Sequence, residues 1–216
     1  MIQQVGPGLF PGDRLRVDVL VEAGADLVVR GQGATKLFPS PSGIPATTVT
    51  RLQVGGGGSL CWLPGELIPF RDAVLQQETS VELAAGGRLA LVELLTPGRA
   101  AMGEREVYTR LDLRLRISIA GRPVLIERTR LEPALRPLGV LGRHGGLACA
   151  GTLYLAGFGA AELECGERED AVRWASGRAV AGDVTFVRLL GETPQALRAV
   201  IDGLLRRIGL DGSTVS

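Results

Sequence analysis

The sequence has little of the material from which catalytic and metal sites are usually built. Its 216 residues include one histidine, His144, and three cysteines, Cys61, Cys149 and Cys165. Because neither a Cys-x-x-Cys motif nor a second histidine occurs, no closed zinc or nickel cage is encoded. Three cysteines that lie far apart also predict no disulfide framework, and we expect them to be reduced and mostly buried.

Further absences narrow the class of protein. The formal net charge is +1, from 24 basic and 23 acidic residues, and this balance argues against a nucleic-acid-binding surface. No apolar run is long enough to cross a bilayer, and the N-terminus lacks the basic start and apolar segment of a signal peptide. We therefore expect a cytoplasmic protein in which residues 1–216 form a single domain that binds neither nucleic acid nor membrane.

Glycine, in contrast, is abundant. The 31 glycines are about twice the usual share and are irregularly spaced, which favours many tight turns between short strands. Between residues 110 and 119 every second side chain is aliphatic, and residues 14–21 repeat this pattern. A side-chain period of two predicts strands with one face in solvent and one face in the core.

An internal repeat arranges these strands further. Residues 19–29, 52–62 and 81–91 match position by position around a central glycine, and residues 117–125 are a shorter relative. Each segment predicts a strand, a glycine-centred turn and a returning strand, so Gly55–Gly58 is expected to be a hairpin turn. The offsets of 33 and 29 residues predict a mainly β fold of stacked layers, of β-helical or solenoid-like type. The alternative is a chance match within a glycine-rich β protein.

Two loops and one helix complete the predicted fold. Residues 39–45 hold three prolines, and residues 132–146 hold two prolines and four glycines, so both are expected to be connections. Near the C-terminus, Thr193 is a candidate N-cap and Pro194 suits the first helical position. Apolar residues at helical spacing then predict one amphipathic helix, which ends at Gly209 and packs on its own sheet rather than on a partner. These residues are Leu197, Val200, Ile201, Leu204, Leu205 and Ile208.

The chemistry of common enzyme sites is missing. His144 stands alone in a glycine-rich loop, no Gly-x-Ser-x-Gly elbow occurs, and residues 55–58 lack the Gly-Lys-Ser/Thr of a phosphate loop. The carboxylates are scattered, so their spacing nominates no acid–base pair. We therefore expect a protein that is not an enzyme and binds no cofactor tightly. The alternatives are a β-rich ligand-binding module, against which the low aromatic content speaks, and a hydrolase with carboxylate chemistry.

Three motifs follow one another along the first half of the chain. Gly12–Leu15 (Gly-Asp-Arg-Leu) precedes Gly33–Phe38 (Gly-Ala-Thr-Lys-Leu-Phe), Leu60–Phe70 contains Leu-Pro-Gly-Glu-Leu-Ile-Pro-Phe, and Gly98–Glu104 (Gly-Arg-Ala-Ala-Met-Gly-Glu) follows Glu93. In this order and spacing they resemble the UreD family of urease accessory proteins, also called UreH. Family members carry more sequence before the first motif, so the N-terminus is shorter than is typical.

The resemblance implies both a fold and a role. UreD-type proteins have a β-rich, helically stacked fold with few helices, and they act with an F-type and a GTP-hydrolysing G-type accessory protein. Together these proteins engage apo-urease as chaperones and allow nickel to enter its active site. The UreD-type protein is the scaffold nearest urease and is a candidate for an internal passage. The resemblance therefore implies a urease maturation factor whose partners are these three proteins, with nickel only in transit.

Residues in or beside the motifs are candidates for the nickel passage. A passing hydrated cation needs sparse oxygen ligands rather than thiolate or imidazole clusters, because tight binding would stop its movement. Ordinary surface or turn-capping carboxylates are the alternative. The candidates for transient contacts, without a fixed metal site, are Asp13, Glu66, Glu93, Glu104 and His144.

Partner binding has candidates of its own. Aromatic side chains are enriched at interfaces, and the second motif carries an apolar cluster in a chain with few aromatic residues. We expect this cluster either to form a docking surface or to be buried in the core. Its members are Trp62, Leu63, Ile68 and Phe70. The charged candidates are Lys36 and Arg99, which are also expected to position a loop by pairing with carboxylates.

Overall fold

The computed structural model describes residues 6–137, 147–158, 172–181 and 183–210. Within these residues the chain forms thirteen strands, one short 3-10 helix at Ala100–Met102 and one α-helix, α1, at Pro194–Arg207. The strands are β1 (Arg14–Val21), β2 (Asp26–Arg30), β3 (Thr35–Leu37), β4 (Ala46–Val54), β5 (Ser59–Leu63), β6 (Glu66–Pro69), β7 (Val74–Leu83), β8 (Arg88–Leu95), β9 (Arg110–Ile119), β10 (Arg122–Leu131), β11 (Cys149–Ala156), β12 (Val172–Arg178) and β13 (Val184–Gly191).

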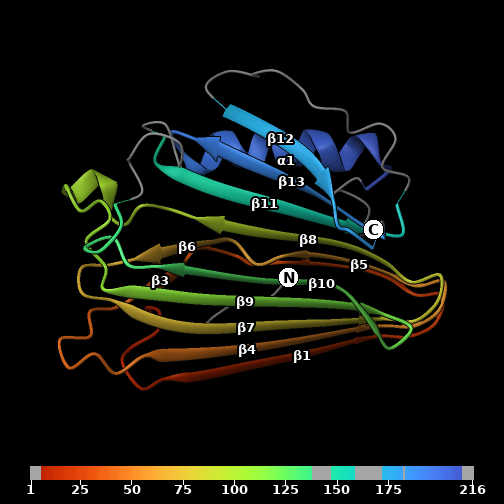
Figure 1. Ribbon diagram of the computed structural model, residues 1–216, viewed down its shortest axis with the longest axis horizontal. Coiled ribbons are helices and arrows are strands. Elements are labelled where there is room, and N and C mark those ends of the chain that lie inside the picture. Colours follow the sequence, from red (N-terminus) through yellow and green to blue (C-terminus); the bar gives the residue numbers. More distant parts are fainter. Residues whose placement is uncertain (1–5, 138–146, 159–171, 182, 211–216) are drawn as a thin grey trace.

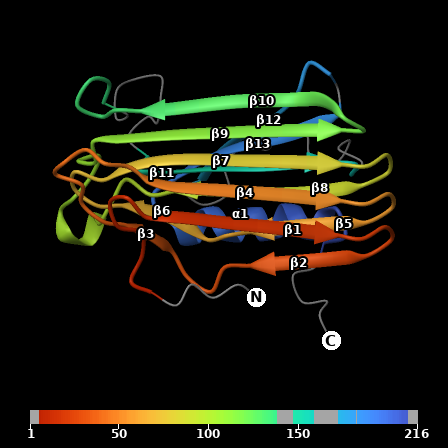
Figure 2. The same cartoon turned by 90° about the horizontal axis from the view of Figure 1, so that it is seen from below.

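The strands form two sheets that face each other. The five-stranded sheet has the order β1-β4-β7-β9-β10, and the eight-stranded sheet follows β12-β13-β11-β8-β5-β2, with β3 and β6 attached beside it. The strands run along the long axis of the molecule (Figure 1), and the view from below shows β1, β4, β7, β9 and β10 side by side (Figure 2). The chain crosses between the layers after β1, β4 and β7, so corresponding strands stack in parallel.

The internal repeat of the sequence is the repeat of a β-solenoid of about three turns. Val19 pairs in register with Leu52, and Leu52 pairs with Val81, as the offsets of 33 and 29 residues predict. The same offsets align Leu60 of β5 with its partners in β2 and β8 on the other layer. The mainly β, solenoid-like fold predicted from the sequence is therefore confirmed.

The turns of the repeat differ from the hairpins that the glycine pattern predicts. β4 and β5 lie in different sheets, so Gly55–Gly58 is a corner between the layers and not a hairpin turn. Gly55 is required there, because a Cβ would lie 2.6 Å from the backbone nitrogen of Ala23 in the preceding corner. Of the four repeat segments, the one at 117–125 folds as a hairpin, between the antiparallel strands β9 and β10.

Apolar side chains fill the space between the layers at both ends. A cluster near the glycine corners includes Leu52, Trp62 and Tyr154, and a smaller cluster at the opposite end includes Leu37 and Leu111. A third cluster lies between the outer face of the eight-stranded sheet and α1. The space between the layers in the middle of the solenoid, between the first two clusters, belongs to neither of them.

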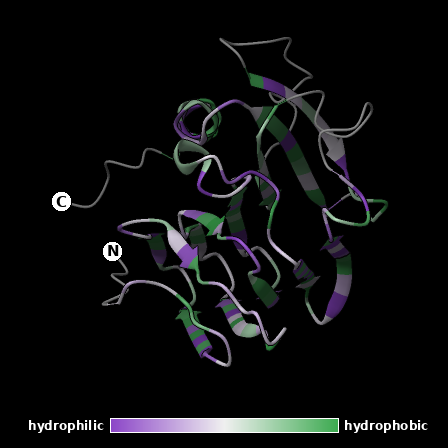
Figure 3. Ribbon diagram, turned by 90° about the vertical axis from the view of Figure 1, so that its left-hand side faces the viewer, coloured by the Kyte–Doolittle hydropathy of each residue, from purple (hydrophilic) through white to green (hydrophobic). Residues whose placement is uncertain are grey.

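The C-terminal helix forms as predicted and covers the eight-stranded sheet, as the end-on view in Figure 3 shows. Thr193 Oγ1 accepts a hydrogen bond from the backbone nitrogen of Ala196, and Gly209 follows the helix with a left-handed φ of 76°. α1 contacts β11, β12 and β13, so packing on its own sheet is confirmed. Neither helix in the described ranges is long and apolar enough to span a membrane. The buried residues of α1 are Leu197, Val200, Ile201, Leu204 and Leu205.

The predicted connections are found where the structure describes them. Residues 39–45 join β3 to β4 as a turn and extended chain, in agreement with their three prolines. Residues 132–137 include a turn after β10. The remainder of the second connection, 138–146, lies outside the described residues.

Candidate functional site: a polar cavity between the layers

Polar side chains interrupt the apolar inner face of the five-stranded sheet. In β4 and β7 the inward positions near both strand ends are apolar, whereas the central ones are Thr48, Thr50, Gln77 and Thr79. The register places Thr48 beside Gln77 and Thr50 beside Thr79. These four residues form a polar stripe across the middle of the layer.

A second polar row crosses the facing layer. Glu93 of β8 pairs in register with Thr152 of β11, and Thr152 pairs with Arg188 of β13. Glu93 shares the inner face of β8 with Leu91 and Leu95, which flank it at alternate positions. Since side chains alternate between the faces of a strand, this register brings the two polar rows face to face.

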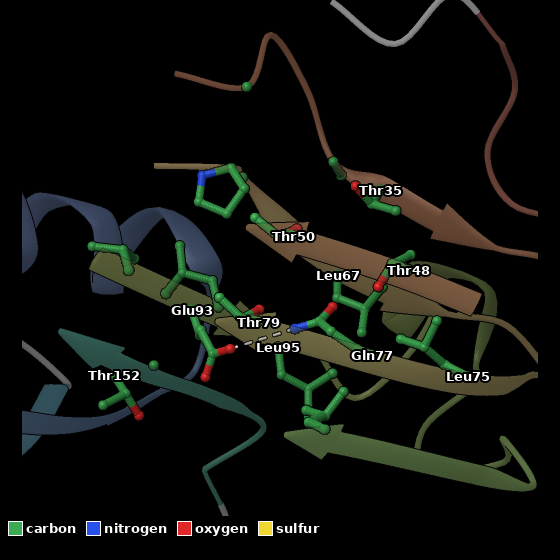
Figure 4. Close-up of a pocket in the computed structure, with 18 of the residues that line it drawn as sticks. Thr35, Thr48, Thr50, Leu67, Leu75, Gln77, Thr79, Glu93, Leu95 and Thr152 are labelled. Carbon is green, nitrogen blue, oxygen red and sulfur yellow. Dashed lines mark hydrogen bonds between the residues drawn. The ribbon is translucent and has the colours of Figure 1, made fainter. Parts of the chain in front are cut away.

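The two rows enclose a cavity of about 730 Å³. Figure 4 shows Glu93 on one wall directed toward Gln77 on the other, with threonines of β4 and β7 nearby. Residues of β1, β4, β7, β9 and β10 all line the cavity, so it crosses the stack of turns. The described lining residues near β1 and β2 are uncharged, whereas Glu127 and Arg188 lie at the end near β10.

Glu93 is held in an environment that favours its neutral form. Burial raises the pKa of Glu93 to about 7, and the negative charge of Glu127 adds to this effect. The charge of Arg188 and the hydrogen bond from Gln77 oppose it. Gln77 Nε2 donates to Glu93 Oε1 over 3.4 Å and links the two walls. A positive charge in the cavity would therefore stabilise a carboxylate that is otherwise poorly compensated.

An ion pair joins the two layers at the charged end of the cavity. Arg188 Nη2 lies 2.5 Å from Glu127 Oε2, and Arg188 Nη1 donates to Thr152 Oγ1 over 2.9 Å. The Tyr154 hydroxyl donates to Glu127 Oε2 over 3.2 Å. The guanidinium also lies 5.3 Å and 5.7 Å from the ring centroids of Phe186 and Tyr154. Arg188 is thus held by contacts on both layers.

The cavity offers oxygen atoms without forming a tight cage. Thr48 is 9% exposed, and its hydroxyl has no hydrogen-bond partner among the described residues. Nowhere in the described ranges do three or more His, Cys, Asp or Glu side chains gather so that they could hold a metal ion. Hydroxyl and carboxylate oxygens bind hydrated divalent cations and keep part of their water shell. Oxygen atoms so arranged do not enclose an ion on all sides.

Of the four candidate carboxylates from the sequence, the structure places Glu93 in the cavity and the others elsewhere. Asp13 accepts a hydrogen bond from the backbone nitrogen of Phe10 over 2.8 Å and so caps a turn. Glu66 is buried and contacts Arg198 of α1, which lies outside the space between the layers. The contact between Glu66 and Arg198 therefore helps to attach α1 to the sheet.

Glu104 and Arg99 pair with each other at one end of the solenoid. Arg99 Nε and Nη2 donate to the two carboxylate oxygens of Glu104 over 2.8 Å and 2.7 Å, and these bonds hold the pKa of Glu104 below its usual value. The pair joins the two ends of the loop around the 3-10 helix, so Arg99 contacts a carboxylate of its own loop. Lys36 is exposed at the same end, and His144 lies outside the described residues.

Of the two alternatives for the apolar cluster around Trp62, the structure shows burial, and a docking surface formed by Trp62 and Phe70 is wrong. Trp62 is 7% exposed and packs between the layers, and Phe70 is also buried, so neither presents a free face. Leu63 and Ile68 are half-buried. The reason is that these residues belong to β5, β6 and the turn after β6, where the alternation of the solenoid directs large side chains into the core.

Phe70 belongs instead to an aromatic stack that reaches the surface. The rings of Phe10 and Phe38 are 4.4 Å apart and nearly parallel, and those of Phe38 and Phe70 are 5.1 Å apart. The guanidinium of Arg99 lies 4.3 Å from the centroid of Phe70. Phe10, the outermost ring, is 43% exposed.

The sequence motifs miss most of the cavity. Gln77 and Thr79 lie between motifs, and Glu127 and Arg188 lie on strands that follow them. These residues are recognisable because each is polar at a strand position where the alternating pattern would place an apolar, inward-facing side chain. The pattern can be used in this way only when it is known which side chains of each strand face inward.

These observations define the class of protein: a β-solenoid with a polar interior, closed on one face by a single helix. Comparison with known proteins then shows the family, since the family model described as UreD urease accessory protein matches residues 1–213. The urease accessory protein UreD 1 of Brucella melitensis biotype 1 is 35% identical over 200 residues, which are 88% of this chain and 69% of that protein. The chain belongs to the UreD family of urease accessory proteins.

Relatives from other bacteria agree with this assignment. The urease accessory protein UreD of Rhodopseudomonas palustris (strain HaA2) is 34% identical over 204 residues, which cover 93% of this chain and 72% of the relative. The protein of the same name from Sorangium cellulosum (strain So ce56) is 32% identical over 209 residues, with 94% and 66% covered. The similarity therefore extends over nearly the whole chain.

Proposed function

We propose that this chain is a urease maturation factor, a scaffold without catalytic activity that recruits an F-type and a G-type accessory protein to apo-urease and assists nickel insertion. The observation that carries this proposal is the family match over residues 1–213. The polar cavity adds a physical route, because it crosses the stack from one edge to the other.

Nickel is the cargo in this proposal and not a resident cofactor. Onward movement requires ligands that bind a hydrated cation weakly, because a deep energy well would retain it. The cavity lining supplies threonine hydroxyls, amide oxygens and the carboxylates of Glu93 and Glu127. These groups favour a cation over an anion without enclosing it.

The proposal is tested by complementation of a urease operon whose own UreD-type gene has been deleted. We expect this chain, expressed with urease and the F-type and G-type proteins, to restore urease activity and the nickel bound per urease. Thr79→Leu, which places a larger side chain in the cavity, should lower both severalfold. Ser80→Leu, its neighbour on the outer face of β7, is the matched control and should lower neither.

Two results would contradict the proposal at different levels. If the unaltered chain restores no activity although it is folded and expressed, the maturation role fails. If Thr79→Leu is folded and activates urease as well as Ser80→Leu does, the role stands but the route through the cavity fails.

A further inference from the structure

We propose that Arg188 gates the β10 end of the cavity: its guanidinium holds Glu127 until a divalent cation takes its place between Glu127 and Glu93. This inference rests on the proposed function, because it assumes that a cation uses the cavity. It adds to that function a means of closing the cavity with a side chain of this chain, without a group from a partner protein.

The position of the ion pair makes it a gate. Glu127 lies on β10, the last strand of the five-stranded sheet, and Arg188 lies on β13 of the facing sheet. Their contact therefore spans the cavity from one layer to the other. Among the described residues of the lining, those near β1 and β2 are uncharged, and two of the three charged ones, Glu127 and Arg188, lie at the end that this pair closes.

The pair can open without disturbing the fold. The side chains of Arg188 and Glu127 are 45% and 22% exposed, and ion pairs so accessible to water contribute little to stability. After release, the guanidinium can keep its hydrogen bond to Thr152 and its contacts with the rings of Phe186 and Tyr154. Arg188 can therefore remain packed on the eight-stranded sheet after it releases Glu127.

A divalent cation is a better partner for two carboxylates than one guanidinium is. The charges of Glu127 and Arg188 both act on Glu93, so the three groups share one electrostatic environment. A divalent ion carries twice the charge of the guanidinium, so it compensates the two carboxylates more fully.

The test measures cation binding directly on the purified full chain. Mn²⁺ alone is the probe, because it prefers carboxylate oxygen to thiolate and imidazole, and the free ion is counted by electron paramagnetic resonance. We expect Arg188→Gln and Arg188→Met to bind Mn²⁺ roughly fivefold to tenfold more tightly than the unaltered chain, since the competing charge is gone. Arg188→Lys, which keeps the charge, should bind as weakly as the unaltered chain.

A second substitution locates the effect. Adding Glu127→Gln to either neutral variant should abolish the gain in affinity. Arg188→Met retains an apolar stem that packs on the two rings, so it provides a folded variant if Arg188→Gln unfolds, and thermal melting followed by circular dichroism verifies the fold. An unchanged affinity in the folded neutral variant would overturn the gate, and so would a gain that survives Glu127→Gln.

The gate and the proposed function fail in different experiments. A chain that activates urease but shows no effect of Arg188 on Mn²⁺ binding would keep its role and lose the gate. A chain that shows the expected order of affinities but does not activate urease would keep the gate and lose the role.

Discussion

A carboxyl group among leucines, such as Glu93 between Leu91 and Leu95, changes how stability depends on pH. Burial raises the pKa of Glu93 from its ordinary 4.5 to about 7. Between these values the folded chain binds more protons than the unfolded chain, so stability falls as pH rises. The stability that protonated Glu93 contributes is complete below pH 4.5, the pKa in the unfolded chain, and it is lost as pH rises through about 7, the pKa in the folded chain.

Glu93→Gln should remove this dependence, because the amide does not titrate. We expect the free energy of unfolding of the unaltered chain to fall by about 3 kcal/mol relative to that of Glu93→Gln between about pH 4.5 and about pH 8. Urea unfolding at both ends of this range measures the difference. Glu78→Gln, on the exposed face of β7, should follow the unaltered chain at every pH. Parallel curves for Glu93→Gln and the unaltered chain would contradict the assigned burial.

At the scale of elements, the corners decide which strands can stack. Gly55 lies against the backbone of Ala23, whereas Gly33 has open space around the position of a Cβ and an ordinary φ. Gly55→Ala should therefore destabilise the chain by about 1–3 kcal/mol, and Gly33→Ala should change stability by less than about 0.5 kcal/mol. The midpoints of urea unfolding measure both. Equal midpoints for the two variants would show that the corners are less crowded than described.

The elements themselves could largely be predicted from the sequence. Alternation at 110–119 marks β9, the 33- and 29-residue offsets give the register of the turns, and Thr193 with the apolar stripe marks α1. The corners could not be distinguished from hairpins, because a glycine turn does not encode which strand becomes the partner. For the site, a motif nominated Glu93, whereas Glu127 and Arg188 meet only when the two layers close.

At the scale of the whole molecule, the two ends of the solenoid present different surfaces. One end carries the glycine corners, and the other carries the aromatic stack of Phe10, Phe38 and Phe70 with Arg99 and Lys36. Aromatic and arginine side chains dominate the binding energy of many interfaces. This composition makes the aromatic end the part of the surface where we expect a protein partner to bind.

Phe10→Ser should reduce co-purification of a tagged F-type protein with this chain, because it removes the exposed ring of the stack. Leu20→Ser removes a large exposed apolar side chain from the outer face of β1 and serves as the control. We expect the control to retain the complex. Equal recovery with both variants would move the docking surface away from this end.

The cavity runs across the strands, so its length depends on the number of turns in the solenoid. Neighbouring strands are about 4.8 Å apart, so the four spacings from β1 to β10 measure about 20 Å. Inserting one turn would lengthen the cavity by one strand spacing and leave its width unchanged, because the width depends on inward side chains and on layers about 10 Å apart. The length and the width of the cavity are therefore set by different parts of the sequence and can vary independently.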